Sequence, residues 1–377
     1  MYSKILFTLS LYYFITLSLF SQEIKNLPAG QAGGEVYSYA RKIVDTMASE
    51  SMHGRGYVNG GDSIAANYLK NEFRKIGLRS FKDDYYQKMS FPINTFPNKI
   101  DLGFNLHNLK DGDVYSFVGY PGKNFLIDPS CPKVYADFGI VVFDSTRCTE
   151  KAYKKFCRKT PKWFYVLVDD RNVKDKNKLA YFSRVKANEM KLYGIIELTK
   201  KLTWSQSQAV SSYVRIQMLQ DSIPYSMPGK KYSDGGGGID SKNEFHSNHQ
   251  SQNVIGYIQG SLYPDSFIVY SAHYDHLGRM GQVCFPGAND NASGCAMLLN
   301  LANYYSKPEN QPKYSVAFMA FCGEEVGLLG SKYYTENPLF PLKNIKFVFN
   351  MDIMGTGEEG ITVVNGTVFK TEFDKLK

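Results

Sequence analysis

The stretch Phe267-Ile-Val-Tyr-Ser-Ala-His-Tyr-Asp-His-Leu-Gly278 decides the fold, because an apolar run leads directly into chemically active side chains and a glycine. A short run this apolar predicts a strand covered on both faces of a sheet. His273 and Asp275 follow at the end of that strand. In an open α/β sheet, ligands bind beyond the carboxyl ends of the strands. The stretch therefore predicts an α/β fold with a site at this edge.

Further acidic residues follow in the last third of the chain. They are Asp290, the pair Glu324 and Glu325, and Asp352. Apolar runs at 314–321 and 345–350 precede the last two positions and predict two more buried strands. Helical patterns are expected between the strands, at 293–305 and 326–334. Because each separation suits one strand and one helix, the chain should return to the same edge of the sheet each time.

These side chains suit a two-metal hydrolase. A neutral imidazole such as that of His273 binds zinc at about 2.0–2.1 Å, and Asp275 could fix its tautomer. A carboxylate such as Asp290 could bridge two ions about 3.5–4 Å apart, although it could also cap the following helix. Adjacent carboxylates at 324 and 325 repel one another and are costly to bury without cations. Taken together, the four positions favour a metal site over solvated turns.

The chain resembles the cocatalytic dizinc aminopeptidases, which include secreted bacterial leucyl-type aminopeptidases and their glutamate-carboxypeptidase-like relatives. The motifs that carry the resemblance are Ser271-Ala-His-Tyr-Asp-His-Leu-Gly278, Gly287-Ala-Asn-Asp-Asn-Ala-Ser-Gly294, Cys322-Gly-Glu-Glu-Val-Gly-Leu-Leu-Gly330 and Asn350-Met-Asp352. The resemblance implies a zinc-exopeptidase fold, which is an open mixed and mostly parallel sheet with helices on both faces. It also implies a zinc-dependent aminopeptidase acting on peptides or proteins with a free N-terminus.

The same resemblance implies a role for each site residue. His273 and Asp352 would bind the first zinc, and Asp290 would bridge the two ions through a cis Asp290–Asn291 peptide. Glu325 would bind the second zinc. Glu324 would act as the general acid and base, and Asp275 would orient the imidazole.

The chain departs from the family pattern in one respect. The family's second zinc takes a His from a late loop, whereas none of the six histidines here follows His276. We therefore expect the second zinc to lack its His, and we interpret the chain as truncated at its C-terminus. Two alternatives remain, a single-zinc glutaminyl cyclase and a non-catalytic binding relative. The intact His273-Tyr-Asp275 motif argues against the cyclase, and the retained upstream ligands argue against the binding protein.

A length of 377 residues with 43% hydrophobic residues suits two lobes. Short β runs at 139–143, 164–168 and 194–198 indicate an inserted, smaller α/β domain, which looks like a protease-associated domain and ends in a glycine linker at 234–238. Before the insertion, Asp62 is expected to cap a helix that ends at Gly77. The predicted organisation is a signal peptide (1–22), a linker (23–34), the N-terminal peptidase part (35–105), the insertion (106–249) and the metal-site part (250–377).

The first residues predict export. A basic start and the apolar stretch 5–20 have the flanks of a signal peptide and are short for a membrane span, although an uncleaved anchor remains an alternative. We expect a periplasmic or secreted protein without a stable membrane anchor after cleavage. Export permits a disulfide among Cys131, Cys148 and Cys157, and buried free thiols are an equal alternative.

The net charge of +8 is spread along the chain, and Lys-rich stretches such as 174–178 also carry Asp. This mixture indicates a solvated face rather than a nucleic-acid groove. We therefore expect peptide substrates and no nucleic-acid partner.

Overall fold

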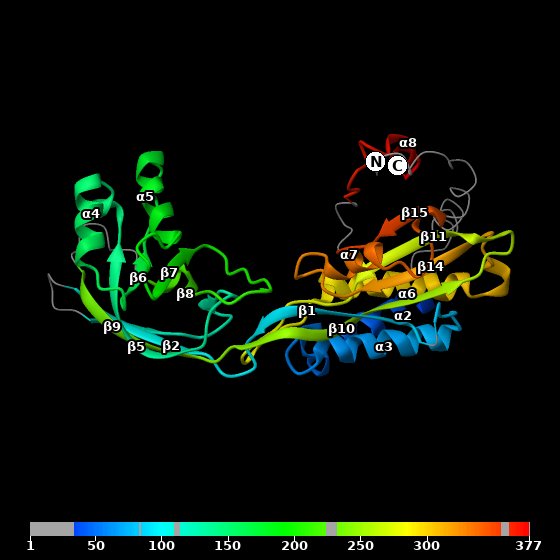
Figure 1. Ribbon diagram of the computed structural model, residues 1–377, viewed down its shortest axis with the longest axis horizontal. Coiled ribbons are helices and arrows are strands. Elements are labelled where there is room, and N and C mark those ends of the chain that lie inside the picture. Colours follow the sequence, from blue (N-terminus) through cyan, green and yellow to red (C-terminus); the bar gives the residue numbers. More distant parts are fainter. Residues whose placement is uncertain (1–33, 83, 109–113, 224–231, 356–361, 377) are drawn as a thin grey trace.

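The computed structural model describes residues 34–82, 84–108, 114–223, 232–355 and 362–376. The predicted signal peptide (1–22) and all but the last residue of the predicted linker (23–34) lie outside these ranges. The described chain forms two lobes joined end to end (Figure 1). Among the described helices, none has the length and apolar character needed to span a bilayer.

The first lobe is built on a five-stranded sheet in the order β1-β10-β14-β11-β15. Its strands are β1 (Tyr86–Thr95), β10 (Glu244–Ile258), β14 (Tyr314–Phe321), β11 (Tyr263–His273) and β15 (Ile345–Asn350). β11 pairs in parallel with β14 and β15, whereas β10 pairs antiparallel with β1 and β14. The sheet is therefore mixed, as predicted, and its parallel part contains the strands that lead into the site.

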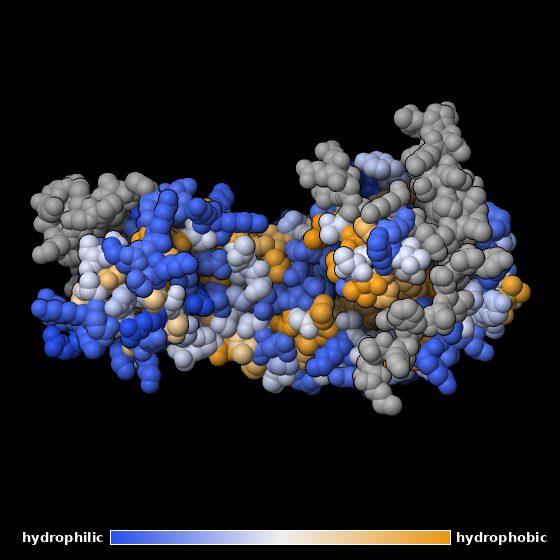
Figure 2. Space-filling model, turned by 90° about the horizontal axis from the view of Figure 1, so that it is seen from above, coloured by the Kyte–Doolittle hydropathy of each residue, from blue (hydrophilic) through white to orange (hydrophobic). Residues whose placement is uncertain are grey.

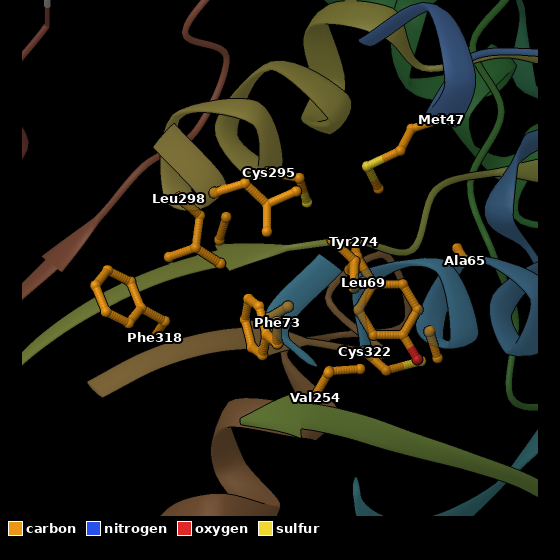
Figure 3. Packing of buried hydrophobic residues seen from close by; sticks show 14 of the residues in the cluster. Met47, Ala65, Leu69, Phe73, Val254, Tyr274, Cys295, Leu298, Phe318 and Cys322 are labelled. Carbon is orange, nitrogen blue, oxygen red and sulfur yellow. The ribbon is translucent and has the colours of Figure 1, made fainter. Parts of the chain in front are cut away.

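Helices cover both faces of this sheet, which confirms the predicted fold class. One face packs against α2 (Gly34–Met47), α3 (Gly61–Ile76) and α6 (Gly294–Tyr305), and their shared core includes Leu69, Phe73 and Leu298 (Figure 3). On the other face a smaller cluster packs around Tyr334 of α7 (Leu329–Glu336). Shorter elements are the β12 (Gly278–Met280) and β13 (Val283–Phe285) hairpin and α8 (Lys370–Leu376).

Helix α3 ends as predicted but begins differently. Gly77 adopts φ 86°, and its N–H donates to the carbonyls of Phe73 and Arg74. The predicted cap by Asp62 is wrong, because this residue lies inside the first turn and its carboxylate turns into the protein. The Oδ2 atom accepts a hydrogen bond from Ser251 Oγ at 2.8 Å and lies 2.9 Å from His249 Nε2. Asp62 therefore fastens α3 to β10.

The inserted lobe has its own eight-stranded sheet in the order β3-β2-β9-β5-β6-β7-β8-β4. The strands are β2 (Asp101–Asn108), β3 (Val114–Val118), β4 (Phe125–Ile127), β5 (Val134–Phe143), β6 (Tyr165–Val168), β7 (Gly194–Thr199), β8 (Val214–Leu219) and β9 (Tyr232–Ser241), with helices α4 (Glu150–Lys159) and α5 (Lys176–Lys186). β5 to β8 are parallel neighbours. The strands of this sheet span Asp101 to Ser241, whereas the predicted insertion spans 106–249, and β10 from Glu244 onward already pairs with β1.

The predicted glycine linker at 234–238 is wrong, because these residues belong to β9, and Gly236, Gly237 and Gly238 pair with both β2 and β5. A Cβ at Gly237 would lie 2.5 Å from the Gly103 carbonyl oxygen and 2.7 Å from Phe138 Cζ. The run of glycines therefore allows two neighbouring strands and their side chains to approach β9 closely.

All six cysteines are free thiols, so the disulfide alternative is not observed. Cys131 and Cys148 are buried.

Hydrophilic residues dominate the outer end of the inserted lobe (Figure 2). In the Lys-rich stretch 174–178, Asp175 caps α5 by accepting from the N–H groups of Asn177 and Lys178.

Candidate metal centre

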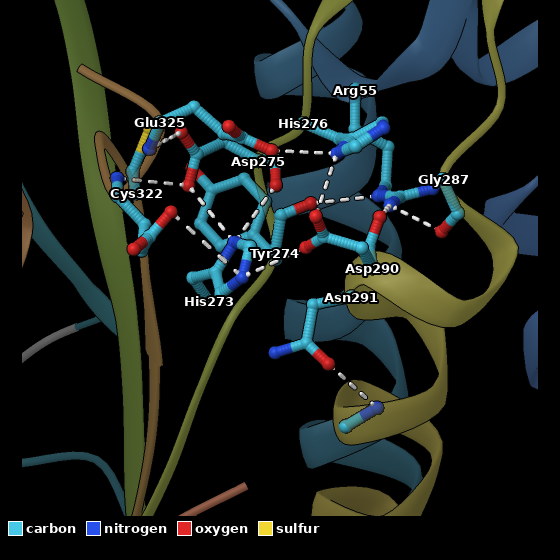
Figure 4. Close-up of polar contacts among 12 residues, drawn as sticks. Arg55, His273, Tyr274, Asp275, His276, Gly287, Asp290, Asn291, Cys322 and Glu325 are labelled. Atoms are coloured by element: carbon cyan, nitrogen blue, oxygen red, sulfur yellow. Dashed lines mark hydrogen bonds and ion pairs between the residues drawn. The ribbon is translucent and has the colours of Figure 1, made fainter. Parts of the chain in front are cut away.

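Side chains from four segments meet beyond the carboxyl ends of the parallel strands (Figure 4). His273 is the last residue of β11, and Asp290 lies in the irregular turn Ala288–Ser293 before α6. Glu324 and Glu325 follow β14, and Asp352 follows β15. The structure therefore brings together all the residues that the sequence predicted.

The first group of possible metal ligands contains His273, Asp290 and Asp352. The Nε2 atom of His273 lies 3.2 Å from Asp290 Oδ1 and 3.4 Å from Asp352 Oδ1. Atoms that each lie about 2 Å from a single tetrahedral zinc ion are separated by similar distances. The three side chains therefore have the spacing to hold one ion.

His273 is oriented by the backbone of Asp275. Its Nδ1 lies 3.1 Å from the carbonyl oxygen of Asp275, while the carboxylate is further away, with Oδ1 at 3.8 Å. When a metal ion displaces the proton of Nε2, an Nδ1–H donated to this carbonyl leaves the Nε2 lone pair for the ion, which is the tautomer that binds metal. The hydrogen bond thus comes from the predicted residue, but from its main chain.

The carboxylate of Asp275 serves the neighbouring turn instead. It accepts hydrogen bonds from Tyr57 Oη at 2.8 Å and from the backbone N–H groups of Glu324 at 3.2 Å and Glu325 at 3.4 Å. The side chain is completely buried, and this burial raises its pKa. Asp275 therefore fixes the turn that carries both glutamates.

A second group of possible ligands contains His276, Asp290 and Glu325. The Nδ1 atom of His276 lies 2.6 Å from Glu325 Oε1 and 3.9 Å from Asp290 Oδ2. The sequence assigned no role to His276, although it stands in the same motif as His273. Asp290 belongs to both groups, which is the position expected of a bridging ligand.

The site concentrates negative charge. Burial raises the pKa of Glu324, His273 lowers it, and the carboxylates of Asp275, Glu325 and Asp352 raise it again, so that the net pKa is raised. A hydrogen bond to His273 lowers the pKa of Asp290. Burial disfavours the charged form of His273, but hydrogen bonds to Asp290 and Asp352 outweigh it and raise the pKa of the imidazole to about 11. Such an environment favours cations.

Arg55, a residue that the sequence did not single out, shapes the site through hydrogen bonds to its backbone. Its buried guanidinium donates to the carbonyls of Tyr274, Pro286 and Gly287 at 2.8 Å each, and to that of Asp290 at 3.2 Å. Arg55 therefore holds the backbone around Asp290. The Asp290–Asn291 peptide bond is cis, as predicted.

Residues 253–376 match the model of peptidase family M28. Aminopeptidase YwaD of Bacillus subtilis (strain 168) is 36% identical over 115 residues, which cover 30% of this chain and 24% of YwaD. A probable zinc metalloprotease of Pyricularia oryzae is also 36% identical over 115 residues, covering 29% of this chain and 22% of that protein. The aligned part thus spans about a quarter of each relative.

Solved structures show the same fold over a longer stretch. The zinc aminopeptidase BSAP of Bacillus subtilis superposes with a TM-score of 0.53 at 18% identity, covering 85% of this chain and 70% of BSAP. An aminopeptidase from Aneurinibacillus sp. strain AM-1 gives a TM-score of 0.50 at 17% identity, covering 83% and 70%. Residues 253–376, which contain every ligand-bearing segment, therefore match peptidase family M28, and the resemblance to zinc aminopeptidases predicted from the motifs is confirmed.

Proposed function

We propose that the protein is a zinc-dependent aminopeptidase that hydrolyses the N-terminal peptide bond of substrates with a free amine. The observation that carries this proposal is the pair of ligand groups that share Asp290. The match to peptidase family M28 and the similarity to aminopeptidase YwaD support it.

Two zinc ions fit the side chains present. His273, Asp290 and Asp352 would hold one ion, and His276, Asp290 and Glu325 would hold the other. Each group offers one imidazole nitrogen and carboxylate oxygens, which are zinc ligands in hydrolytic sites. Bound zinc would polarise the scissile carbonyl and lower the pKa of water.

Glu324 is the proposed general base and acid. Its side chain is 34% exposed, so a water molecule or a leaving amine can reach the carboxylate. The raised pKa of Glu324 suits a group that first accepts a proton and then returns it. Asp275 would keep the Glu324 backbone in place through the hydrogen bonds described above.

Zinc content and substrate preference test this function together. Metal-free protein should bind two zinc ions per chain, and the zinc-loaded protein should cleave aminoacyl 4-nitroanilides but not their N-acetylated forms. Equal cleavage of both forms would contradict an aminopeptidase. A single zinc would instead favour the alternative of a one-metal glutaminyl cyclase, which an assay with an N-terminal glutaminyl peptide would detect.

The role of His276 can be tested on its own. A His276→Ala variant should bind one zinc tightly and lose the second, whereas the matched control His246→Ala, at an exposed position outside both groups, should bind two. Two tightly bound zinc ions in His276→Ala would show that the second ion takes its ligands elsewhere. The late His of the family would then remain the predicted ligand.

We also propose export to the periplasm or the medium, on the basis of the signal peptide predicted at residues 1–22. Sequencing the N-terminus of the mature protein would test this: a start near residue 23 supports export, and retention of Met1 contradicts cleavage. The resemblance of the insertion to a protease-associated domain remains a prediction.

A further inference from the structure

One loop of the inserted lobe reaches the metal centre of the other lobe. It connects β7 to β8, comprises residues 200–213 and is named the bracing loop here. Figure 1 shows it in green, projecting from β7 and β8 toward the first lobe. The loop contacts two of the four segments that carry possible metal ligands, and it contacts the strand that leads into a third.

Two glutamines of the loop bind the backbone of the ligand-bearing turns. Gln206 Nε2 donates a hydrogen bond to the carbonyl of Leu277 at 2.6 Å, and Leu277 directly follows His276. Gln208 Nε2 donates to the carbonyl of Val326 at 2.9 Å, and this residue directly follows Glu325. Both hydrogen bonds therefore fall beside ligands of the second group.

An aromatic contact reaches the strand that precedes the third segment. The ring of Trp204 stacks on that of Phe285, with centroids 5.1 Å apart and planes at 15°. Phe285 is the last residue of β13 and leads into the turn that carries Asp290, the third member of the second group. The bracing loop thus contacts the residues directly after His276 and Glu325 and the strand that precedes the Asp290 turn.

The loop is itself fixed at several points. Trp204 Nε1 donates to the Ile127 carbonyl at 3.0 Å within the inserted lobe. The side chain of Gln217 accepts from Thr203 N–H at 3.1 Å and donates to the Thr203 carbonyl at 2.8 Å. Asn94 N–H of β1 donates to the Ser207 carbonyl at 2.8 Å. A loop held in this way can position what it contacts.

We propose that the bracing loop positions the ligands of the second ion, with Gln206 and Gln208 as the positioning residues. The turns that carry these ligands contain glycines and bear carboxylates that repel one another without a cation. Removing a hydrogen-bonding group that orients a metal ligand commonly lowers the metal affinity about 10–100-fold. The inserted domain therefore contributes to the metal centre that the proposed function requires.

The test compares Gln206→Met and Gln208→Met, singly and combined, with Gln250→Met. Methionine keeps the unbranched shape and adds no charge, but it cannot donate a hydrogen bond. Gln250 is a matched control, because its Nε2 also donates to a backbone carbonyl, that of Asn248 at 3.3 Å, at an exposed position of β10. Zinc binding is measured on the full, metal-free chain by competition with a chromogenic chelator.

In the double variant we expect the dissociation constant of the second zinc to rise about 10–100-fold and that of the first to stay unchanged. The melting temperature of the metal-free double variant should match that of Gln250→Met, which separates positioning from a loss of folding. Two unchanged zinc constants would overturn the proposal. Wild-type protein that binds only one zinc would instead overturn the two-ion function, and the bracing role with it.

Discussion

Both lobes place acidic side chains near the carboxyl ends of parallel strands, but they balance the charge differently. In the inserted lobe, Asp169 follows β6 and contacts Arg171 through both oxygens, at 2.9 and 2.8 Å. Glu197 in β7 lies 2.7 Å from Arg215 Nε. These two carboxylates therefore have permanently charged partners within the chain.

In the first lobe, the ion pairs recorded among described residues for the site carboxylates involve only His273 and His276. The nearby guanidinium of Arg55 is committed to backbone carbonyls. Arginine partners balance the charge of carboxylates within the protein. Carboxylates that are paired only with imidazoles can instead share those imidazoles as ligands of a metal ion. The same position in two similar sheets can thus serve stability in one and chemistry in the other.

The largest expected effect comes from removing the proposed base. Glu324→Gln should lower kcat about 10²–10⁴-fold, because general acid–base catalysis contributes about this much. Zinc binding should persist, since Glu324 belongs to neither ligand group. Steady-state kinetics and zinc titration measure the two effects.

Glu197→Gln is the control for Glu324→Gln, because it makes the same change in the inserted sheet and should leave kcat unchanged. The metal-free Glu324→Gln protein should also melt at the same or a higher temperature than wild type. The raised pKa of Glu324 means that its charged form is disfavoured in the folded state. Removing the charge therefore removes an unfavourable contribution to the free energy of folding. Full activity in Glu324→Gln would contradict the proposed mechanism.

A smaller effect is expected from the metal itself. Each zinc ion, at 100 times its dissociation constant, should stabilise the folded chain by about 2.7 kcal/mol, because it binds the native state alone. Asp290→Asn should remove most of this gain, since Asp290 is shared by both groups. Denaturant unfolding with and without zinc measures it, and Asp265→Asn, an exposed substitution in β11, should keep the full gain.

The reciprocal substitution in the inserted lobe should cost stability instead. Asp169→Asn removes one carboxylate that pairs with Arg171, whose side chain is only 9% exposed, and should lower the free energy of unfolding by about 1–3 kcal/mol. Asp101→Asn is the control, because the Asp101–Lys99 pair is largely exposed and should matter little. A fall in kcat without loss of stability in Asp169→Asn would break the comparison between the lobes.

The sequence was informative where a residue's role follows from its place in a pattern. Apolar runs located β14 and β15 at their observed bounds, and the residues after those strands gave Glu324, Glu325 and Asp352 of the candidate site. Arg55, Gln206 and Gln208 were missed, because a long polar side chain that binds a distant carbonyl leaves no periodic signal. His276 was missed for another reason, since the family resemblance assigned the second imidazole to a later loop.

The glycines of β9 give the last test, because composition alone suggested a linker there. Gly237→Ala should destabilise the inserted lobe by about 1–3 kcal/mol, the usual cost of overpacking. Its Cβ would lie 2.5 Å from both the Gly103 carbonyl oxygen and Phe104 Cβ. Gly236→Ala is the matched control, since its nearest neighbour, the Phe138 carbonyl oxygen, would be 3.8 Å away. If denaturant unfolding showed equal effects for the two, flexibility rather than close packing would explain the glycines.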